Sequence, residues 1–257
     1  MHRLGKSALF APVVAIMVGL VAAPQVRADV IVAPNANVVI EGNASSTAPF
    51  NGPFRYQQDY EASQFGGTPF LINAIAFRAD ASQSAAFSAT VANMTVMLSL
   101  TNKGTNGGAG GMSSTFAANI LGAQTTVFSG GITFNSTPTG SPHPFDVVIP
   151  LATSYLYDPS QGNLLMEIVN QSAWTVTPGG EFGFLDFDFS NGSPRPIARI
   201  FANGSPSSPT ATVANANDPN RGLVTEFIGD VIGVPEPASL GLMLIGLGAI
   251  ARRRRRA

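Results

Sequence analysis

Cysteine is absent from the sequence, and charged residues are scarce. Without cysteine neither a disulfide nor a thiolate metal site can form, so an exported domain of this composition must be stabilised by its apolar core. Charged residues make up 11% of the 257 residues, whereas soluble proteins average about 25%. No long helical periodicity alternates with the strand-like segments, which disfavours a parallel α/β sheet.

Histidine is almost absent as well, and this limits the catalytic sites that the chain can form. His143 is the only histidine beyond residue 28, and no G-x-S-x-G sequence occurs, so a catalytic triad and a zinc site both lack their usual residues. Glycoside hydrolysis needs only two carboxylates, and the candidates by residue type alone are Asp146, Glu167, Glu181, Asp186 and Asp188. Solvated strand faces explain most of these. We therefore expect no catalytic residues and no enzymatic activity, with a glycoside hydrolase as the less favoured alternative.

The first 28 residues have the pattern of a signal peptide. A basic start is followed by an apolar stretch at 8–23 and by a cleavage-like ending at Val26-Arg27-Ala28. A permanent N-terminal membrane helix is the alternative, but Pro12 and the ending weigh against it. We expect cleavage between Ala28 and Asp29, so that the mature chain lies outside the cytoplasm.

The last 27 residues, 231–257, combine three features in order. The tripeptide Pro235-Glu236-Pro237 precedes an uncharged apolar run at 238–251 and five arginines, Arg252, Arg253, Arg254, Arg255 and Arg256. As a helix the run is about 21 Å long, short of the roughly 30 Å hydrocarbon core, and the arginines would stop transfer on the cytoplasmic side. The prolines keep the tripeptide extended. We expect transient association with the inner membrane; an ordinary anchor and a nucleic-acid-binding tail are the alternatives.

These features together resemble the PEP-CTERM sorting signal of exported bacterial proteins. The resemblance rests on Pro235, Glu236 and Pro237, the Gly-containing apolar run and the terminal arginines. It implies processing by an exosortase-type membrane transpeptidase. It also implies a cell-surface or extracellular location in a bacterium that makes a polysaccharide matrix.

The chain between the two terminal segments is acidic. Residues 29–237 contain all fifteen Asp and Glu but six of the fourteen Lys and Arg, which gives a formal charge of −9. This charge disfavours binding to nucleic acid or to an anionic membrane surface, and it is compatible with cations and neutral glycans.

Residues 29–230 form one predicted all-β domain, an antiparallel β-sandwich for which a jelly roll is one form considered. In the predicted strand 95–101, alternate residues Val96, Leu98 and Leu100 share one face. In the predicted strand 145–151, one face carries Phe145, Val147, Ile149 and Leu151. Around Phe128, Ile132 and Phe134 a bulge or turn is expected at Gly130-Gly131. Further strands are predicted at 30–41, 70–78, 86–91, 163–169, 181–189, 197–202 and 223–228, one short helix at 113–121, and loops at 101–111 and 203–222.

Two segments of this domain, 55–65 and 155–168, resemble segments that recur in an uncharacterised group of PEP-CTERM proteins. That resemblance supplies no catalytic residues. Tyr56, Tyr60, Tyr155 and Tyr157 are either core residues or platforms on which a glycan stacks. Exposure of these tyrosines or of Trp174 would favour a glycan-binding module, and burial would favour a structural or adhesive matrix component.

The segment EFGFLDFDFSNG, 181–192, has the most distinctive alternation in the domain. Leu185, Phe187 and Phe189 are predicted to face the core, with Asp186 and Asp188 on the opposite, solvated face. Phe182 and Phe184 break this phase, so either a bulge lies near Gly183 or that end is covered on both faces. No metal site is firmly predicted. A weak Ca²⁺ site formed by the two aspartates and a neighbouring loop is kept as a hypothesis.

Overall fold

The computed structural model describes residues 29–106, 110–177, 185–189 and 196–232, and these residues form an all-β structure. Every pairing between its strands is antiparallel, as the sequence predicted, and no α-helix occurs in the described ranges. The strands are β1 (Asp29–Ala33), β2 (Ala44–Ser46), β3 (Phe54–Tyr60), β4 (Phe70–Phe77), β5 (Phe87–Thr101), β6 (Leu121–Ser136), β7 (Val147–Tyr157), β8 (Asn163–Asn170), β9 (Thr175–Thr177), β10 (Leu185–Phe189), β11 (Ile197–Ala202), β12 (Ala216–Pro219), β13 (Arg221–Leu223) and β14 (Thr225–Val231).

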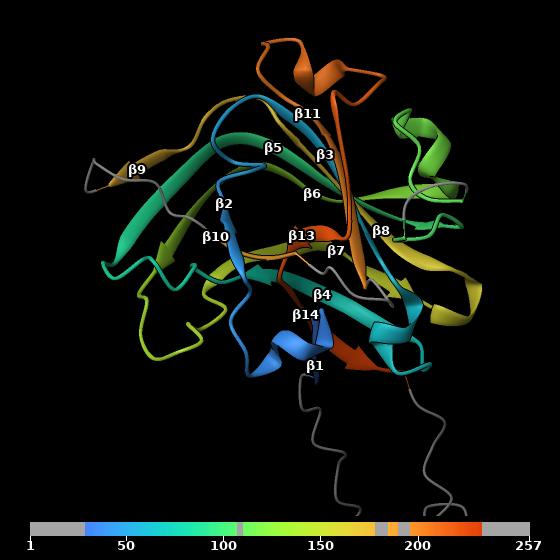
Figure 1. The fold of residues 1–257 in the computed structure, drawn as a ribbon, viewed down its shortest axis with the longest axis horizontal. Coiled ribbons are helices and arrows are strands. Elements are labelled where there is room, and N and C mark those ends of the chain that lie inside the picture. The colour runs from blue at the N-terminus through green and yellow to red at the C-terminus, as the bar shows by residue number, and fades with distance from the viewer. Residues whose placement is uncertain (1–28, 107–109, 178–184, 190–195, 233–257) are drawn as a thin grey trace, which may run out of the picture.

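Two large sheets and one small sheet make up the described structure (Figure 1). The larger has the strand order β12-β11-β3-β8-β5-β6, with β9 paired to β5, and the second has the order β1-β14-β4-β7. The small sheet, β13-β10-β2, lies beside them. The arrangement is sandwich-like, with sheets facing one another across a shared core.

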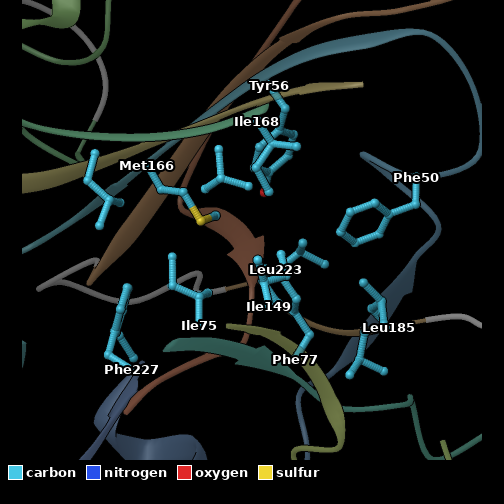
Figure 2. Close-up of a cluster of buried hydrophobic side chains, with 14 of the residues drawn as sticks. Phe50, Tyr56, Ile75, Phe77, Ile149, Met166, Ile168, Leu185, Leu223 and Phe227 are labelled. Atoms are coloured by element: carbon cyan, nitrogen blue, oxygen red, sulfur yellow. The ribbon is translucent and has the colours of Figure 1, made fainter. Parts of the chain in front are cut away.

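The core is formed by side chains from all three sheets (Figure 2). Val96 and Leu98 of β5 are fully buried and Leu100 packs against them, which confirms the predicted face. Val147 and Ile149 of β7 are buried opposite them, and Leu185 of β10 joins the same cluster. Large alternating apolar residues therefore determine which face of each strand is inside.

Strands β5 and β6 extend the predicted segments. The predicted strands 86–91 and 95–101 are parts of one continuous strand, β5, which pairs with β6. The pairing shifts between Val91–Ile132 and Met94–Gly130, which confirms an irregularity at Gly130-Gly131. Gly130 has φ 141°, a conformation that favours glycine.

Strand β3 has no counterpart among the predicted strands. Its Tyr56 and Tyr60 face the main core, while Gln57 and Asp59, on the other face, are also fully buried. A second apolar cluster explains this burial, because it covers the outer face of the same sheet; its members are Met112, Phe116, Leu165, Ala198, Ile200 and Ala202.

Three local predictions were wrong in extent. The strand predicted at 30–41 ends at Ala33, because Pro34 has no N–H to donate and the 3-10 helix η1 (Asn35–Val38) follows. The predicted helix at 113–121 is the short 3-10 helix η3 (Phe116–Asn119), and β6 begins at Leu121. The predicted loop 203–222 contains η5 (Ser208–Thr210), β12 and most of β13. The remaining 3-10 helices are η2 (Ala62–Phe65) and η4 (Pro159–Gln161).

Candidate functional site: a buried cluster of carboxylates

Three carboxylates from distant parts of the chain meet beside the small sheet. Asp186 lies on β10, Asp80 follows the end of β4, and Glu41 lies between η1 and β2. Each offers an oxygen within 4.8 Å of the oxygens offered by the other two. The main chain fixes this arrangement, because Asp186 N–H donates to the Arg78 carbonyl at 3.0 Å and the Asp186 carbonyl accepts from Val224 N–H at 3.1 Å.

Arg78 is the cation within this cluster, and it is fully buried. Its Nε donates to Asp186 Oδ2 at 2.6 Å, and both side chains have no exposed surface. The remaining guanidinium nitrogens donate to the carbonyls of Asn37 at 3.0 Å and Ile40 at 2.7 Å. Phe145 covers the guanidinium, with its ring centroid 4.9 Å away. Arg78 thus holds the segment around η1 against β10.

The cluster contains more acceptors than donors. Asp186 Oδ2 also accepts from Gly42 N–H, whereas Asp186 Oδ1 and both carboxylate oxygens of Glu41 are buried without a hydrogen-bond partner. Asp80 Oδ1 accepts from the N–H and hydroxyl of Ser82. Burial raises the pKa of Glu41, and the charge of Asp186 adds to this effect. Burial also raises the pKa of Asp186, although Arg78 opposes the change.

These contacts correct the prediction that Asp186 lies on a solvated face. Asp186 has no exposed surface, while Leu185 and Phe187, on the other face of β10, are in the core. β10 is therefore covered on both faces at this point, whereas the two alternatives considered for the end with Phe182 and Phe184 concern residues outside the described ranges. Asp188 is only partly buried, pairs across to Gly222, and is not part of the carboxylate cluster. The side chain of Phe189 and residues 181–184 lie outside the described residues.

The other carboxylates considered for hydrolysis have separate partners. Glu167 accepts from Arg55 Nε at 2.8 Å, from Gln57 at 2.7 Å and from Gln124 at 3.0 Å. Asp146 accepts from the N–H of Thr137 at 2.7 Å, and Glu181 lies outside the described residues. His143 is partly buried, with Nε2 placed 2.9 Å from the Gln83 carbonyl and Nδ1 without a partner.

The aromatic residues considered as glycan platforms are mostly inside the protein. Tyr56, Tyr60 and Tyr157 are fully buried, and Trp174 is 6% exposed and stacks on Phe50. Tyr155 is half-buried against the core, and burial raises its pKa. Every aromatic side chain that the structure describes is buried or partly buried; that of Phe189 is outside this set. A row of solvent-facing rings is therefore not found in this part of the chain.

The comparison with known families concerns the C-terminal segment. The PEP-CTERM protein-sorting motif matches residues 233–256. The chain carries a PEP-CTERM sorting motif. This confirms the resemblance seen in Pro235-Glu236-Pro237, the apolar run and the arginines, all of which lie outside the described residues, as does the predicted signal peptide at 1–28. A PEP-CTERM motif implies export, processing by an exosortase and a location at the cell surface or beyond.

No curated protein and no solved structure matches the chain. Among the residues that the structure describes, no helix has the length and apolar character needed to cross a membrane.

Proposed function

We propose that the protein is a non-enzymatic structural or adhesive component of the cell surface or the extracellular matrix. The observation that carries this proposal is the PEP-CTERM motif at 233–256, which directs an exported protein to the exosortase. In this proposal 1–28 is removed as a signal peptide and 238–251 holds the chain in the inner membrane until processing occurs. The β domain is then the part of the chain that reaches its destination.

The strand order supports a jelly-roll sandwich as the fold that is delivered. In an eight-stranded jelly roll, the first, eighth, third and sixth strands form one sheet and the second, seventh, fourth and fifth form the other. The two large sheets contain this order, as β1-β14-β4-β7 in one and β3-β8-β5-β6 in the other. The eight strands, counted from first to eighth along the chain, are then β1, β3, β4, β5, β6, β7, β8 and β14. The strands β2, β9, β10, β11, β12 and β13 are additions to it. Because this fold occurs with many functions, it does not by itself favour an enzyme.

Burial of the aromatic residues favours a structural role over a glycan-binding module. Stacking on a sugar requires an exposed ring, and Tyr56, Tyr60 and Tyr157 instead contribute to the core. The ion pair of Glu167 with Arg55 and that of Asp186 with Arg78 likewise support structural roles for these two acids. A glycan array probed with residues 29–234 tests this choice. No retained glycan is expected, and saturable binding to one glycan class would favour the binding module.

Two variants of the tail test the sorting proposal in the producing cell. A chain that ends at Ile232 lacks the whole signal, and a chain with P235A, E236A and P237A keeps the apolar run and the arginines. We expect the first to be released as a soluble protein with β-type circular dichroism, and the second to remain unprocessed in the inner membrane. If the triple variant reached the surface like the wild type, the motif would not be the processing signal.

A further inference from the structure

We propose that Glu41, Asp80 and Asp186 bind one divalent cation, and that Ca²⁺ is the ion that their oxygen-only donor set favours. This site is independent of the sorting function. It differs from the pair of aspartates predicted from the sequence, because Asp188 is replaced by two acids from distant segments.

The spacing of the three carboxylates fits a single ion. Ca²⁺ is bound by protein oxygens at about 2.3–2.6 Å, so two oxygens on one ion are at most about 5 Å apart. The oxygens offered by Glu41, Asp80 and Asp186 all lie within 4.8 Å of one another. One ion between them would contact all three, and water would complete the six to eight ligands that Ca²⁺ requires.

Unpartnered oxygens in the cluster indicate a ligand independently of this spacing. The Asp186 side chain is fully buried, and its Oδ1 has no hydrogen-bond partner although Oδ2 accepts from Arg78 and Gly42. Both carboxylate oxygens of Glu41 are also buried and unpartnered. A buried carboxylate oxygen without a donor is costly and rare in native proteins. A bound cation would satisfy all three atoms.

The charge of the cluster leaves room for a divalent ion. The three carboxylates carry three negative charges when ionised, and the neighbouring Arg78 carries one positive charge. Arg78 does not neutralise Glu41 by contact, because neither carboxylate oxygen of Glu41 has a hydrogen-bond partner, and the guanidinium nitrogens donate to Asp186 and to the carbonyls of Asn37 and Ile40. The excess of two negative charges equals the charge of Ca²⁺.

The ion would connect three segments that are far apart in the sequence. Glu41 belongs to the connection between η1 and β2, Asp80 to the connection after β4, and Asp186 to β10. Binding would fix the first of these connections against the small sheet. Because an ion that binds only the folded state stabilises it, Ca²⁺ should raise the unfolding temperature. At about one hundred times the dissociation constant the expected rise is about 5–10 °C.

The test uses the full chain, purified in a mild detergent and freed of metal with a chelator. Titration with CaCl₂ in a calorimeter is expected to show one site, and unfolding is followed in CaCl₂, in MgCl₂ and in EDTA. The informative variants are E41Q and D80N, which remove a charge but leave the Arg78–Asp186 pair intact. E61Q is the matched control, because Glu61 is also a partly buried glutamate outside the cluster and accepts from Thr105.

We expect E41Q and D80N each to weaken Ca²⁺ binding at least about tenfold, and E61Q to bind like the wild type. In EDTA, E41Q should unfold at a higher temperature than the wild type, because it relieves repulsion among unneutralised carboxylates. In CaCl₂ that order should reverse.

Two results would overturn the proposal. One is the absence of any heat or temperature shift with CaCl₂ and MgCl₂, or an E41Q variant that is more stable than the wild type in every buffer, since either would mean that no divalent ion neutralises the cluster. The other is Ca²⁺ binding that E41Q and D80N leave unchanged, which would place the ion elsewhere. Circular dichroism in EDTA verifies that each variant is folded before either result is interpreted.

Discussion

Replacement of Asp186 by Asn should destabilise the protein strongly, because Arg78 would lose the carboxylate with which it forms a buried, hydrogen-bonded ion pair. Both side chains have no exposed surface, and the N–O distance is 2.6 Å. Removing one member of a buried ion pair costs about 3–5 kcal/mol, since the remaining charge is left uncompensated. A solvated aspartate, as predicted from the alternation of β10, would change the stability by at most about 0.5 kcal/mol.

A second ion pair provides the matched control. Arg199 and Asp218 are 3.0 Å apart with 11% and 26% of their side chains exposed, so this pair is more accessible to solvent than Arg78–Asp186, and we expect it to contribute less, about 1 kcal/mol. D218N makes the same chemical change as D186N in a wetter environment. Urea unfolding in EDTA, followed by circular dichroism, gives the free energy of unfolding of both variants.

The double variant R78M/D186N separates the pair from its surroundings. Because it leaves neither charge without the other, it should cost less than the sum of R78M and D186N. If D186N cost no more than D218N, or if the single costs simply added, the buried pair would not have the role assigned to it.

Three further substitutions test other parts of the structure. Burial raises the pKa of Asp59 well above its usual range, so the folded state binds this proton more tightly than the unfolded state, and the contribution of Asp59 to stability should fall as the pH rises from about 4 toward neutral. D59N should therefore be more stable than the wild type at pH 7, and a difference in urea midpoint between D59N and the wild type that is the same at pH 4 and pH 7 would contradict this. Leu98 and Ile149 are fully buried, so L98A and I149A should each lose about 2–5 kcal/mol in the same assay, and losses below about 1 kcal/mol at both would mean that the core was assigned wrongly. An added Cβ at Gly229 would lie 1.9 Å from the Leu71 carbonyl oxygen, so G229A should lose about 1–3 kcal/mol, and a neutral result would show that β14 shifts easily there.

The sequence predicted those parts of the fold in which burial alternates along one strand. β5, β7 and β8 are amphipathic or apolar over several residues, and a strand with one buried face is recognisable from its own residues. β3 was missed because Gln57, Gln58 and Asp59 interrupt this pattern. Their burial depends on partners far along the chain: Gln57 donates to Glu167 and Gln58 donates to the Leu223 carbonyl.

Of the carboxylate cluster, only Asp186 was among the residues proposed for a metal site, because the sequence shows the alternation within one strand but not the contacts between distant segments. The phase of Leu185 and Phe187 is local information and was correct, and it placed Asp186 on the opposite face. What covers that face is not local, because Arg78 and Glu41 are more than one hundred positions away. A buried aspartate and a solvated one have the same sequence pattern here, and only the tertiary structure distinguishes them.

The mass of the mature protein recovered from the cell surface or the medium tests the central claim most directly. If the chain is exported and then processed at its PEP-CTERM motif, the intact mass should correspond to a protein that begins at Asp29 and has lost the apolar run and the five arginines. The chain with P235A, E236A and P237A, analysed alongside it, should keep Arg252–Arg256. Recovery of the wild-type chain from the surface with these arginines still attached would contradict processing at the motif.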